Sequence, residues 1–179
     1  MTQKKIKKSF VLQTNENGCG PACLSSICNY YGKSVSQEQI SILSGSTIYG
    51  TSLLGLYQAA KSLGFEAEGY ETDIEHLKKI NLPCILPVIV NKRYEHYIVC
   101  YLYDGSNFII GNPSTGIHKI SESELIRIWD SRSLLLVSTI AKENKKNNNT
   151  RKGKINWFIL TLQADFPRRC GFVIRTNFI

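Results

Sequence analysis

Through the first 65 residues, apolar positions recur every three or four residues, which is the spacing of amphipathic helices that pack on a core. The longest stripe begins at Cys19 and continues through Leu24, Ile27, Cys28 and Tyr31. It is followed by Gly32, a residue type favoured just beyond a helix C-terminus. Two shorter helices are predicted, one over residues 36–45 that opens with a Ser/Gln capping box and one over residues 51–64. The N-terminal part of the chain is therefore expected to be helical.

From residue 65 onward the pattern changes to the short apolar runs and alternating positions of strands, separated by Gly, Pro, Asn and Asp. The predicted strands cover residues 65–70, 84–90, 97–103, 108–110, 117–120 and 134–139. Two short helices interrupt them, one from Asp73 to Ile80 and one that opens with a capping box formed by Ser121 and Glu124. Helices followed by a mostly antiparallel sheet predict an α+β fold, in which an N-terminal helical half packs on a C-terminal sheet.

The C-terminal end differs in composition from the rest of the chain. Residues 142–154, KENKKNNNTRKGK, are polar and of low complexity, and they are predicted to be a basic linker. Residues 155–179 begin with an apolar run that is too short to cross a bilayer, and we interpret them as a short apolar tail at the truncated start of a membrane region. The folded domain is expected to occupy residues 1–141.

The formal net charge of +8 is concentrated at the two ends of the chain. Residues 1–8 hold four Lys and no acidic residue, and residues 142–154 hold six basic residues against one Glu. Residues 9–141, in contrast, hold nine basic and twelve acidic residues. A slightly acidic body argues against a nucleic-acid partner, which would need basic side chains on the domain itself. The basic ends fit either an anionic membrane surface or simple exposure to solvent.

The six cysteines predict neither disulfides nor a metal site. No apolar secretory signal is found in the charged first eight residues, so a reducing compartment is expected. Four cysteines fall inside predicted helices or strands and are expected to be small core residues: Cys23, Cys28, Cys84 and Cys100. Cys19 and Cys23 have CxxxC spacing with no matching second pair, so we expect no bound metal or other cofactor in this chain.

The stretch QTNENGCGPACL, residues 13–24, joins a polar loop to the first predicted helix and carries a candidate nucleophile. Cys19 lies in the first turn, where the partial positive charge of a helix N-terminus lowers the pKa of a thiol. Its neighbours Gly18 and Gly20 are small enough to let a substrate backbone approach. The amide of Gln13 could point to the same place as the Cys19 backbone N–H, which would form an oxyanion hole for acyl transfer. A lone cysteine at a helix start would more often be a buried core residue.

His96 and Asn112 supply the other two roles of a thiol-dependent site. His96 opens the strand HYIVCY, where alternation places it on one face with Ile98 and Cys100. Asn112 ends the next predicted strand, so pairing of the two strands would bring it beside His96 as the group that orients the ring. Either residue alone is a weak indication. The other two histidines, His76 and His118, lie in polar surroundings and are not expected to be catalytic.

With these residues in place, the sequence resembles the double-glycine leader peptidases, the papain-like cysteine peptidase domains of bacteriocin-exporting ABC transporters. The matching motifs are Gln13, GCGPACL around Cys19, YYGK, GTSLLGL, LGF, HYIVCY with His96, and NPSTG with Asn112. The resemblance covers residues 8 to 140. It implies a papain-like fold, a leader-bearing precursor peptide as substrate, cleavage after a Gly-Gly or Gly-Ala pair, and a cytoplasmic location at the inner face of the membrane.

Two departures from the family pattern bear on this interpretation. The family usually has Asp where this chain has Asn112, which removes a negative charge beside the imidazolium. The chain also lacks a Walker A motif and a spanning segment, so ATP would act only through a fused or partner transporter, whose membrane and ATPase parts are the implied partners. The sequence also fits two alternatives. One is a non-catalytic domain that docks the substrate of a peptide exporter, and the other is a different papain-like thiol acyl-transfer enzyme.

Overall fold

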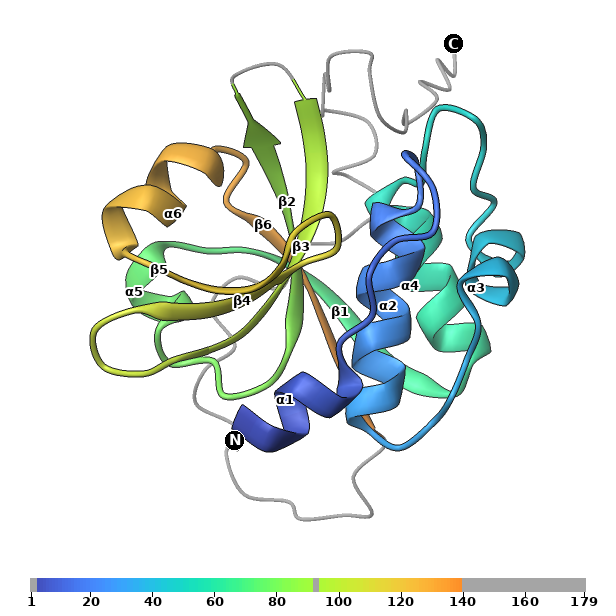
Figure 1. Cartoon of the computed structure of the whole chain (residues 1–179), viewed down its shortest axis with the longest axis horizontal. Coiled ribbons are helices and arrows are strands. Elements are labelled where there is room, and N and C mark those ends of the chain that lie inside the picture. Colours follow the sequence, from blue (N-terminus) through green and yellow to red (C-terminus); the bar gives the residue numbers. More distant parts are fainter. Residues whose placement is uncertain (1–2, 92–93, 140–179) are drawn as a thin grey trace, which may run out of the picture.

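Four helices come first in the chain and a sheet follows, in the computed structural model, which describes residues 3–91 and 94–139 (Figure 1). The helices of the N-terminal half are α1 (Gln3–Ser9), α2 (Cys19–Tyr30), α3 (Gln37–Leu43) and α4 (Leu53–Ser62). The strands are β1 (Phe65–Glu71), β2 (Cys84–Val90), β3 (Tyr94–Tyr103), β4 (Phe108–Asn112), β5 (Gly116–Ile120) and β6 (Ser133–Thr139). Two short helices lie between strands, α5 (Ile74–Leu77) and α6 (Glu122–Ile128).

The strands form a single sheet in the order β1-β6-β2-β3-β4-β5, and every described pairing is antiparallel. The chain therefore runs along neighbouring strands from β2 to β5, while β6 returns to lie between β1 and β2. This arrangement confirms the predicted α+β class. The order matters for the site, because it makes β3 and β4 neighbours and places their ends beside the helical half.

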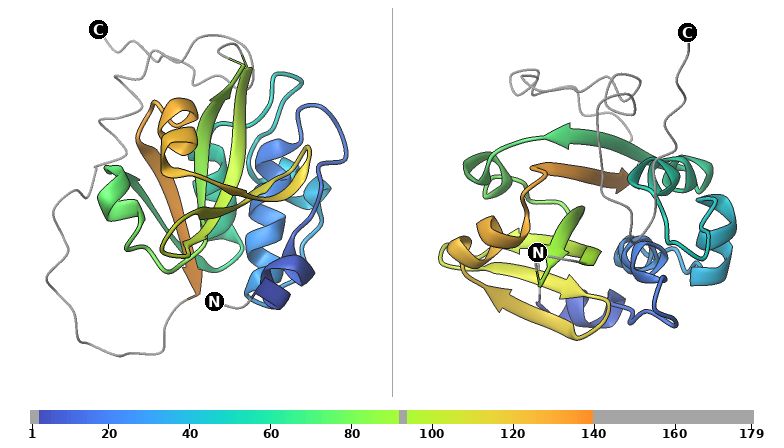
Figure 2. Two further views of the ribbon diagram at one scale, coloured as in Figure 1. Left: turned by 60° about the vertical axis from the view of Figure 1, so that its left-hand side comes forward. Right: turned by 90° about the horizontal axis from the view of Figure 1, so that it is seen from above.

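The sheet is covered on both faces, by different helices (Figure 2). One core joins α2 and α4 to the sheet residues Ile85, Val99 and Tyr101. The opposite core contains Trp129, which is fully buried at the end of α6, together with Ile98 and Cys100 from the sheet. Residues of β3 thus alternate between the two cores, as predicted from the sequence.

Helix boundaries follow local sequence rules. The side chains of Ser36, Ser52, Asp73 and Ser121 accept hydrogen bonds from backbone N–H groups of the first turns of α3, α4, α5 and α6. Gly32 ends α2 with a φ of 83°, a left-handed conformation that suits glycine. The main differences from the predicted elements are a shorter α5, which stops at Leu77, and a longer β3, which starts at Tyr94.

The basic N-terminal residues form a helix that the sequence pattern did not predict, and their four Lys are exposed. Residues 3–9 form α1, and Ile6 on this helix is only 1% exposed. The Lys5 ammonium lies 3.9 Å from the centre of the Tyr30 ring, a cation–π distance. One buried apolar residue among four Lys gives no helical periodicity, so the sequence pattern alone did not reveal this helix.

The predicted linker 142–154, the apolar tail 155–179 and Cys170 lie outside the described residues. Among residues 3–91 and 94–139, no helix is both long enough and apolar enough to cross a bilayer.

Candidate active site

Cys19 is the first residue of α2, within the first turn as predicted, and the residue is only 6% exposed. Its backbone N–H is one of the first four of the helix, which have no intrahelical acceptor. The loop before it folds back on itself, because the Gly18 N–H donates to the Asn15 carbonyl at 3.2 Å. The helix packs against β3, the strand that carries His96.

Gly20 lies where α2 meets the start of α4. A Cβ at this position would lie 3.2 Å from Thr51 Cβ and 3.3 Å from Leu56 Cδ1. Gly20 is also buried. Its lack of a side chain therefore allows α2 to pack closely against the start of α4.

His96 and Asn112 lie together at the ends of β3 and β4, as the strand pairing predicted. The distance from His96 Nε2 to Asn112 Oδ1 is 2.9 Å. The same Oδ1 accepts a hydrogen bond of 2.9 Å from the Ser114 backbone N–H, which fixes the amide with its oxygen toward the ring. His96 Nε2 must then be the protonated nitrogen, because an acceptor faces it, and Nδ1 carries the free lone pair in the neutral ring.

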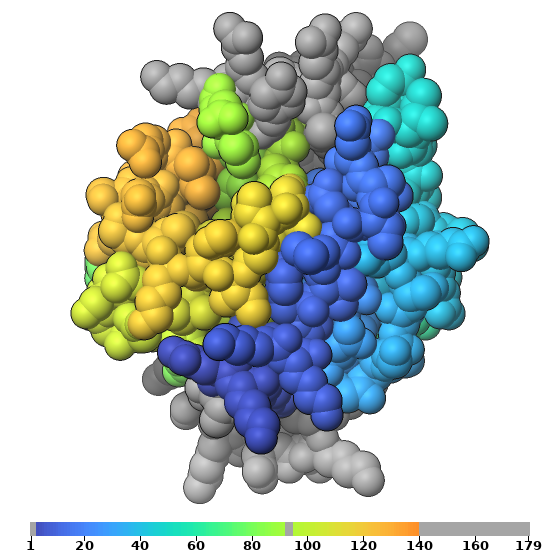
Figure 3. Space-filling view, in the orientation of Figure 1, coloured from blue at the N-terminus to red at the C-terminus, as the bar shows by residue number. Residues whose placement is uncertain are grey.

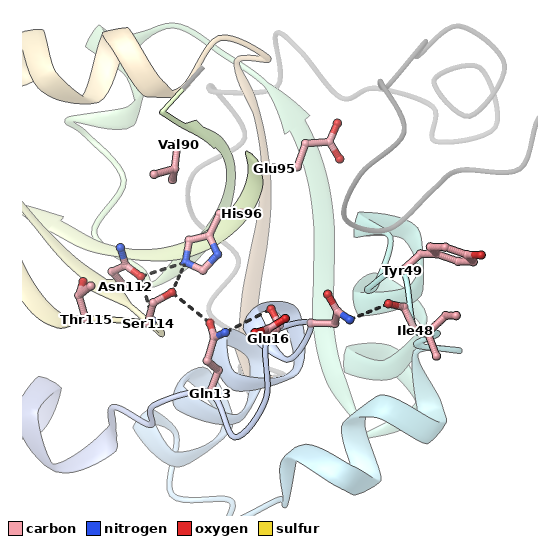
Figure 4. A pocket seen from close by; sticks show the side chains of 11 residues that line it. Gln13, Glu16, Ile48, Tyr49, Val90, Glu95, His96, Asn112, Ser114 and Thr115 are labelled. Carbon is pink, nitrogen blue, oxygen red and sulfur yellow. Dashed lines mark hydrogen bonds between the residues drawn. The ribbon is translucent and has the colours of Figure 1, made fainter. Parts of the chain in front are cut away.

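Gln13 reaches the same place from the helical half. Its backbone N–H donates to the Pro113 carbonyl at 2.9 Å, which ties the incoming segment to the turn after β4. Its side-chain Nε2 donates to the carbonyls of Asn15 at 2.8 Å and Glu16 at 3.3 Å. Its Oε1 accepts from the Ser114 hydroxyl at 3.2 Å, and that hydroxyl is also 3.3 Å from His96 Nε2. Figure 4 shows this row of side chains.

A pocket of about 540 Å³ opens beside these residues. Gln13, His96, Asn112 and Ser114 line one part of it, and Ile48 and Tyr49 line another (Figure 4). Ile48 is 78% exposed and Tyr49 is 65% exposed, although both are large apolar side chains. The pocket therefore joins polar groups arranged for chemistry to an apolar rim that could contact a peptide.

Burial sets the electrostatics of the site. It lowers the pKa of His96 below its ordinary value, and the hydrogen bond to Asn112 partly offsets this effect. Glu95 precedes His96 and also lines the pocket, and burial raises the pKa of its carboxyl to about 7. Its Oε1 is buried without a hydrogen-bond partner.

The other cysteines and histidines of the described region are buried in the core or bonded to polar neighbours. Cys23, Cys28, Cys84 and Cys100 are buried, as predicted, and each is a free thiol. Burial raises the pKa of Cys23 and brings that of Cys28 to about 12. His76 pairs with Asp73 in α5, and His118 bonds to the Thr115 hydroxyl. No group of three or more potential ligands in residues 3–91 and 94–139 is arranged to hold a metal ion.

Sequence reasoning missed Ser114, Glu95 and the apolar pair Ile48 and Tyr49. Ser114 could have been noticed from its place two residues after Asn112, since an Asn side chain commonly accepts from the backbone N–H at that position. No local sequence pattern identifies the other three, because only the folding of the chain brings them to the pocket.

A helix-borne thiol on one half, with a histidine and an orienting amide on a facing sheet, is the arrangement of papain-like cysteine peptidases. The chain belongs to the peptidase C39 family, whose model matches residues 7–142. It is thus a cysteine-type peptidase by fold and family.

The named relatives are larger proteins. The chain is 34% identical over 157 residues to the pediocin PA-1 transport/processing ATP-binding protein PedD of Pediococcus acidilactici, which covers 84% of this chain and 21% of that protein. It is 32% identical over 124 residues to the lactococcin-G-processing and transport ATP-binding protein LagD of Lactococcus lactis, covering 68% of this chain and 18% of that protein. The chain thus spans only about a fifth of these relatives' length.

Two solved structures with about the same sequence identity as these relatives have the same fold. The peptidase domain of Streptococcus ComA, described as a bifunctional ABC transporter, matches with a TM-score of 0.68 at 30% identity, over 73% of this chain and 97% of that one. A double glycine motif protease from an AMS/PCAT transporter, solved with its leader peptide, matches with a TM-score of 0.66 at 30% identity, over 73% of this chain and 90% of that one.

Proposed function

We propose that this chain is a thiol endopeptidase that removes the leader from a secreted-peptide precursor by cutting after a double-glycine pair. The observation that carries the proposal is the 2.9 Å bond between His96 and Asn112, which fixes the ring beside the pocket and next to the helix that starts at Cys19. The names of the relatives, which process bacteriocins, and of a neighbour solved with a leader peptide support this choice of substrate.

In the proposed reaction, His96 Nδ1 takes the proton of the Cys19 thiol, and the thiolate attacks the carbonyl carbon of the second glycine. The C–N bond then breaks, and the imidazolium gives its proton to the departing amine. Water, deprotonated by His96, hydrolyses the thioester and releases the leader carboxylate. Asn112 carries no proton in these steps and holds the ring in the required tautomer.

The oxyanion of the tetrahedral intermediate is proposed to bind the Cys19 backbone N–H and the Gln13 side-chain amide. Both hydrogens on Gln13 Nε2 have acceptors in the free protein, at 2.8 Å from Asn15 and 3.3 Å from Glu16. The longer contact is the weaker one. We therefore expect the substrate to displace the Glu16 carbonyl while the Asn15 bond holds the amide in place.

Affinity must come from parts of the precursor outside the scissile pair, because glycine buries almost no apolar surface. Ile48 and Tyr49 are exposed on the pocket rim and are suited to contact apolar side chains of a leader. A leader helix with apolar residues three and four positions apart would bury them on binding.

We further propose that cleavage is coupled to export, with this domain on the cytoplasmic side of the membrane beside the membrane and ATPase parts of an ABC transporter. The basis is the naming of the relatives as transport and processing ATP-binding proteins. ATP would act only in those transporter parts.

A purified-protein assay tests the function. A synthetic precursor with a leader ending in Gly-Gly should be cut once, after the second glycine, as read by mass spectrometry. The same precursor with Val in place of that glycine should remain whole, because a branched side chain would block access to the thiol. Efficient cleavage of the Val precursor, or cleavage elsewhere in the peptide, would disprove the double-glycine assignment.

A further inference from the structure

The Ser114 hydroxyl sits between two groups that the proposed chemistry uses separately. Its oxygen is 3.2 Å from Gln13 Oε1 and 3.3 Å from His96 Nε2. Gln13 belongs to the segment before α2, whereas His96 belongs to β3, so this hydroxyl connects the two halves of the site (Figure 4).

The direction of every hydrogen bond in this row follows from its two ends. At one end, Gln13 Nε2 faces two backbone carbonyls, so Oε1 must face Ser114 and can only accept. At the other end, Asn112 Oδ1 accepts from the Ser114 backbone N–H, so His96 Nε2 must donate. The single Nε2–H of His96 is then shared: its main acceptor is Asn112 Oδ1 at 2.9 Å, and the Ser114 hydroxyl is a second, weaker acceptor at 3.3 Å. The hydroxyl donates its own hydrogen to Gln13 Oε1.

We infer that Ser114 is a positioning residue that couples the oxyanion-binding amide of Gln13 to the charge state of His96. The inference rests on the proposed function, since it assigns a task to a residue of the same site. When His96 becomes an imidazolium, its Nε2–H becomes a stronger donor to Ser114 Oγ. A hydroxyl that accepts more strongly also donates more strongly, because linked hydrogen bonds polarise one another. Gln13 is therefore held most firmly at the stage when the oxyanion forms.

The chain allows this role to be separated from a structural one. The turn after β4 depends on the backbone of Ser114, whose N–H bonds to Asn112, and on the Gln13 N–H bonded to the Pro113 carbonyl. The hydroxyl takes no part in either bond. Ser114 is also exposed, so Ser114→Ala removes the hydroxyl without leaving a cavity in the core.

The test compares kcat, KM and the pH dependence of kcat/KM for cleavage of a double-glycine precursor. Ser114→Ala should lower kcat about tenfold with little change in KM, since the lost interaction acts mainly in the transition state. The alkaline limb of the profile should move to lower pH, because the charged ring loses an acceptor. Ser114→Thr, which keeps a hydroxyl, should restore most of the rate. Ser123→Ala, which removes an exposed hydroxyl on α6, should behave as the wild type.

A double-mutant cycle gives the sharper result. In a Gln13→Ala background, Ser114→Ala should cost only about two- to threefold, because the hydroxyl has lost the partner through which it acts. If the rate losses of Gln13→Ala and Ser114→Ala simply multiply in the double variant, the coupling is disproved. It is also disproved if Ser114→Thr does not restore the rate, or if Ser114→Ala leaves the rate unchanged. If the wild-type protein cuts the precursor, any of these outcomes removes only this inference. If the wild type does not cut it, the proposed function itself fails.

Discussion

The two halves of the site are held in place by different means. The helical half presents Cys19 and Gln13 through backbone features, a helix N-terminus and a loop that folds onto its own carbonyls. The sheet half presents His96 and Asn112 as a bonded pair, placed by the register of adjacent strands. The sheet therefore fixes the tautomer and orientation of the base, while the helix supplies the local charge at the thiol.

The contrast makes the seam between the halves the sensitive part of the molecule. Figure 3 shows the N-terminal segment lying directly against the β4–β5 region on this face. The Phe10 ring sits on Gly111 of β4, where a Cβ would come within 2.8 Å of the ring. The Gln13 N–H bonds to the Pro113 carbonyl just beyond. Each of these contacts joins two residues that are far apart in sequence, and together they fix the position of the segment before Cys19 relative to the strand ends that carry His96 and Asn112.

Removing one reacting group from either half should have the largest effect. Cys19→Ala and His96→Ala should each reduce kcat/KM by about 10⁴-fold or more, because the nucleophile and the base act as a unit. Neither change should unfold the protein, so circular dichroism should match the wild type. Residual cleavage by Cys19→Ala within about tenfold of the wild type would mean that another residue is the nucleophile.

Weakening the orientation of the base should cost less. Asn112→Ala should reduce kcat/KM by about 10- to 100-fold. The His96 ring loses the hydrogen-bond acceptor that orients it, but it can still take the proton from the Cys19 thiol. Asn112→Asp should keep activity, and its charge should raise the pKa of His96 and extend the alkaline limb of the pH profile. Complete loss in Asn112→Asp would instead assign this residue to the turn alone.

Disturbing the seam should affect stability and activity together. Gly111→Ala should destabilise the protein by about 1–3 kcal/mol, because the new methyl group overlaps Phe10. Chemical denaturation measures the change. Combining it with Phe10→Ala should remove the closest overlap and leave only the contact with the Tyr101 ring at 3.0 Å, so the double variant should lose less than the sum of the two single changes. If the losses in unfolding free energy are additive, the Phe10 ring does not determine how closely the N-terminal segment packs against β4.

The smallest effect is expected at Glu95. Its pKa of about 7 lies above the ordinary value of 4.5, so the folded state binds the proton more tightly, and stability is lost as pH rises from 4.5 to 7. Glu95→Gln should stabilise the protein above pH 7 by on the order of 1 kcal/mol, reduced by solvent at this half-buried group. Below pH 4.5 it should have little effect. Thermal melts above pH 7 and below pH 4.5 check this prediction. An equal change in Tm at both would show that ionisation of Glu95 is not the cause.

Much of this architecture was predictable from sequence because its signals are local. The stripe after Cys19, the alternation in β3 and the caps at Ser36 and Ser121 each depend on residues a few positions apart. The proximity of His96 to Asn112 could be predicted by assuming that strands consecutive in the sequence pair with each other.

What could not be predicted depends on long-range packing. The Gln13–Ser114 bond joins residues 101 positions apart, and no local pattern specifies it. The close packing of Gly20 against Thr51 and Leu56 also depends on residues that are distant in sequence. In α1 the buried Ile6 is a single position, too few for a period to be visible.

The most direct test of the central claim, that the halves assemble a reactive thiol at Cys19, is competitive alkylation at neutral pH followed by mass mapping. Cys19 should be modified first, because burial raises the pKa of Cys23 and Cys28, and a hydrogen bond with Cys100 together with burial raises that of Cys84, so that few of these thiols ionise. His96→Ala should slow modification of Cys19 and leave the other sites unchanged. Prior modification of another cysteine, or an unchanged Cys19 rate in His96→Ala, would contradict the account.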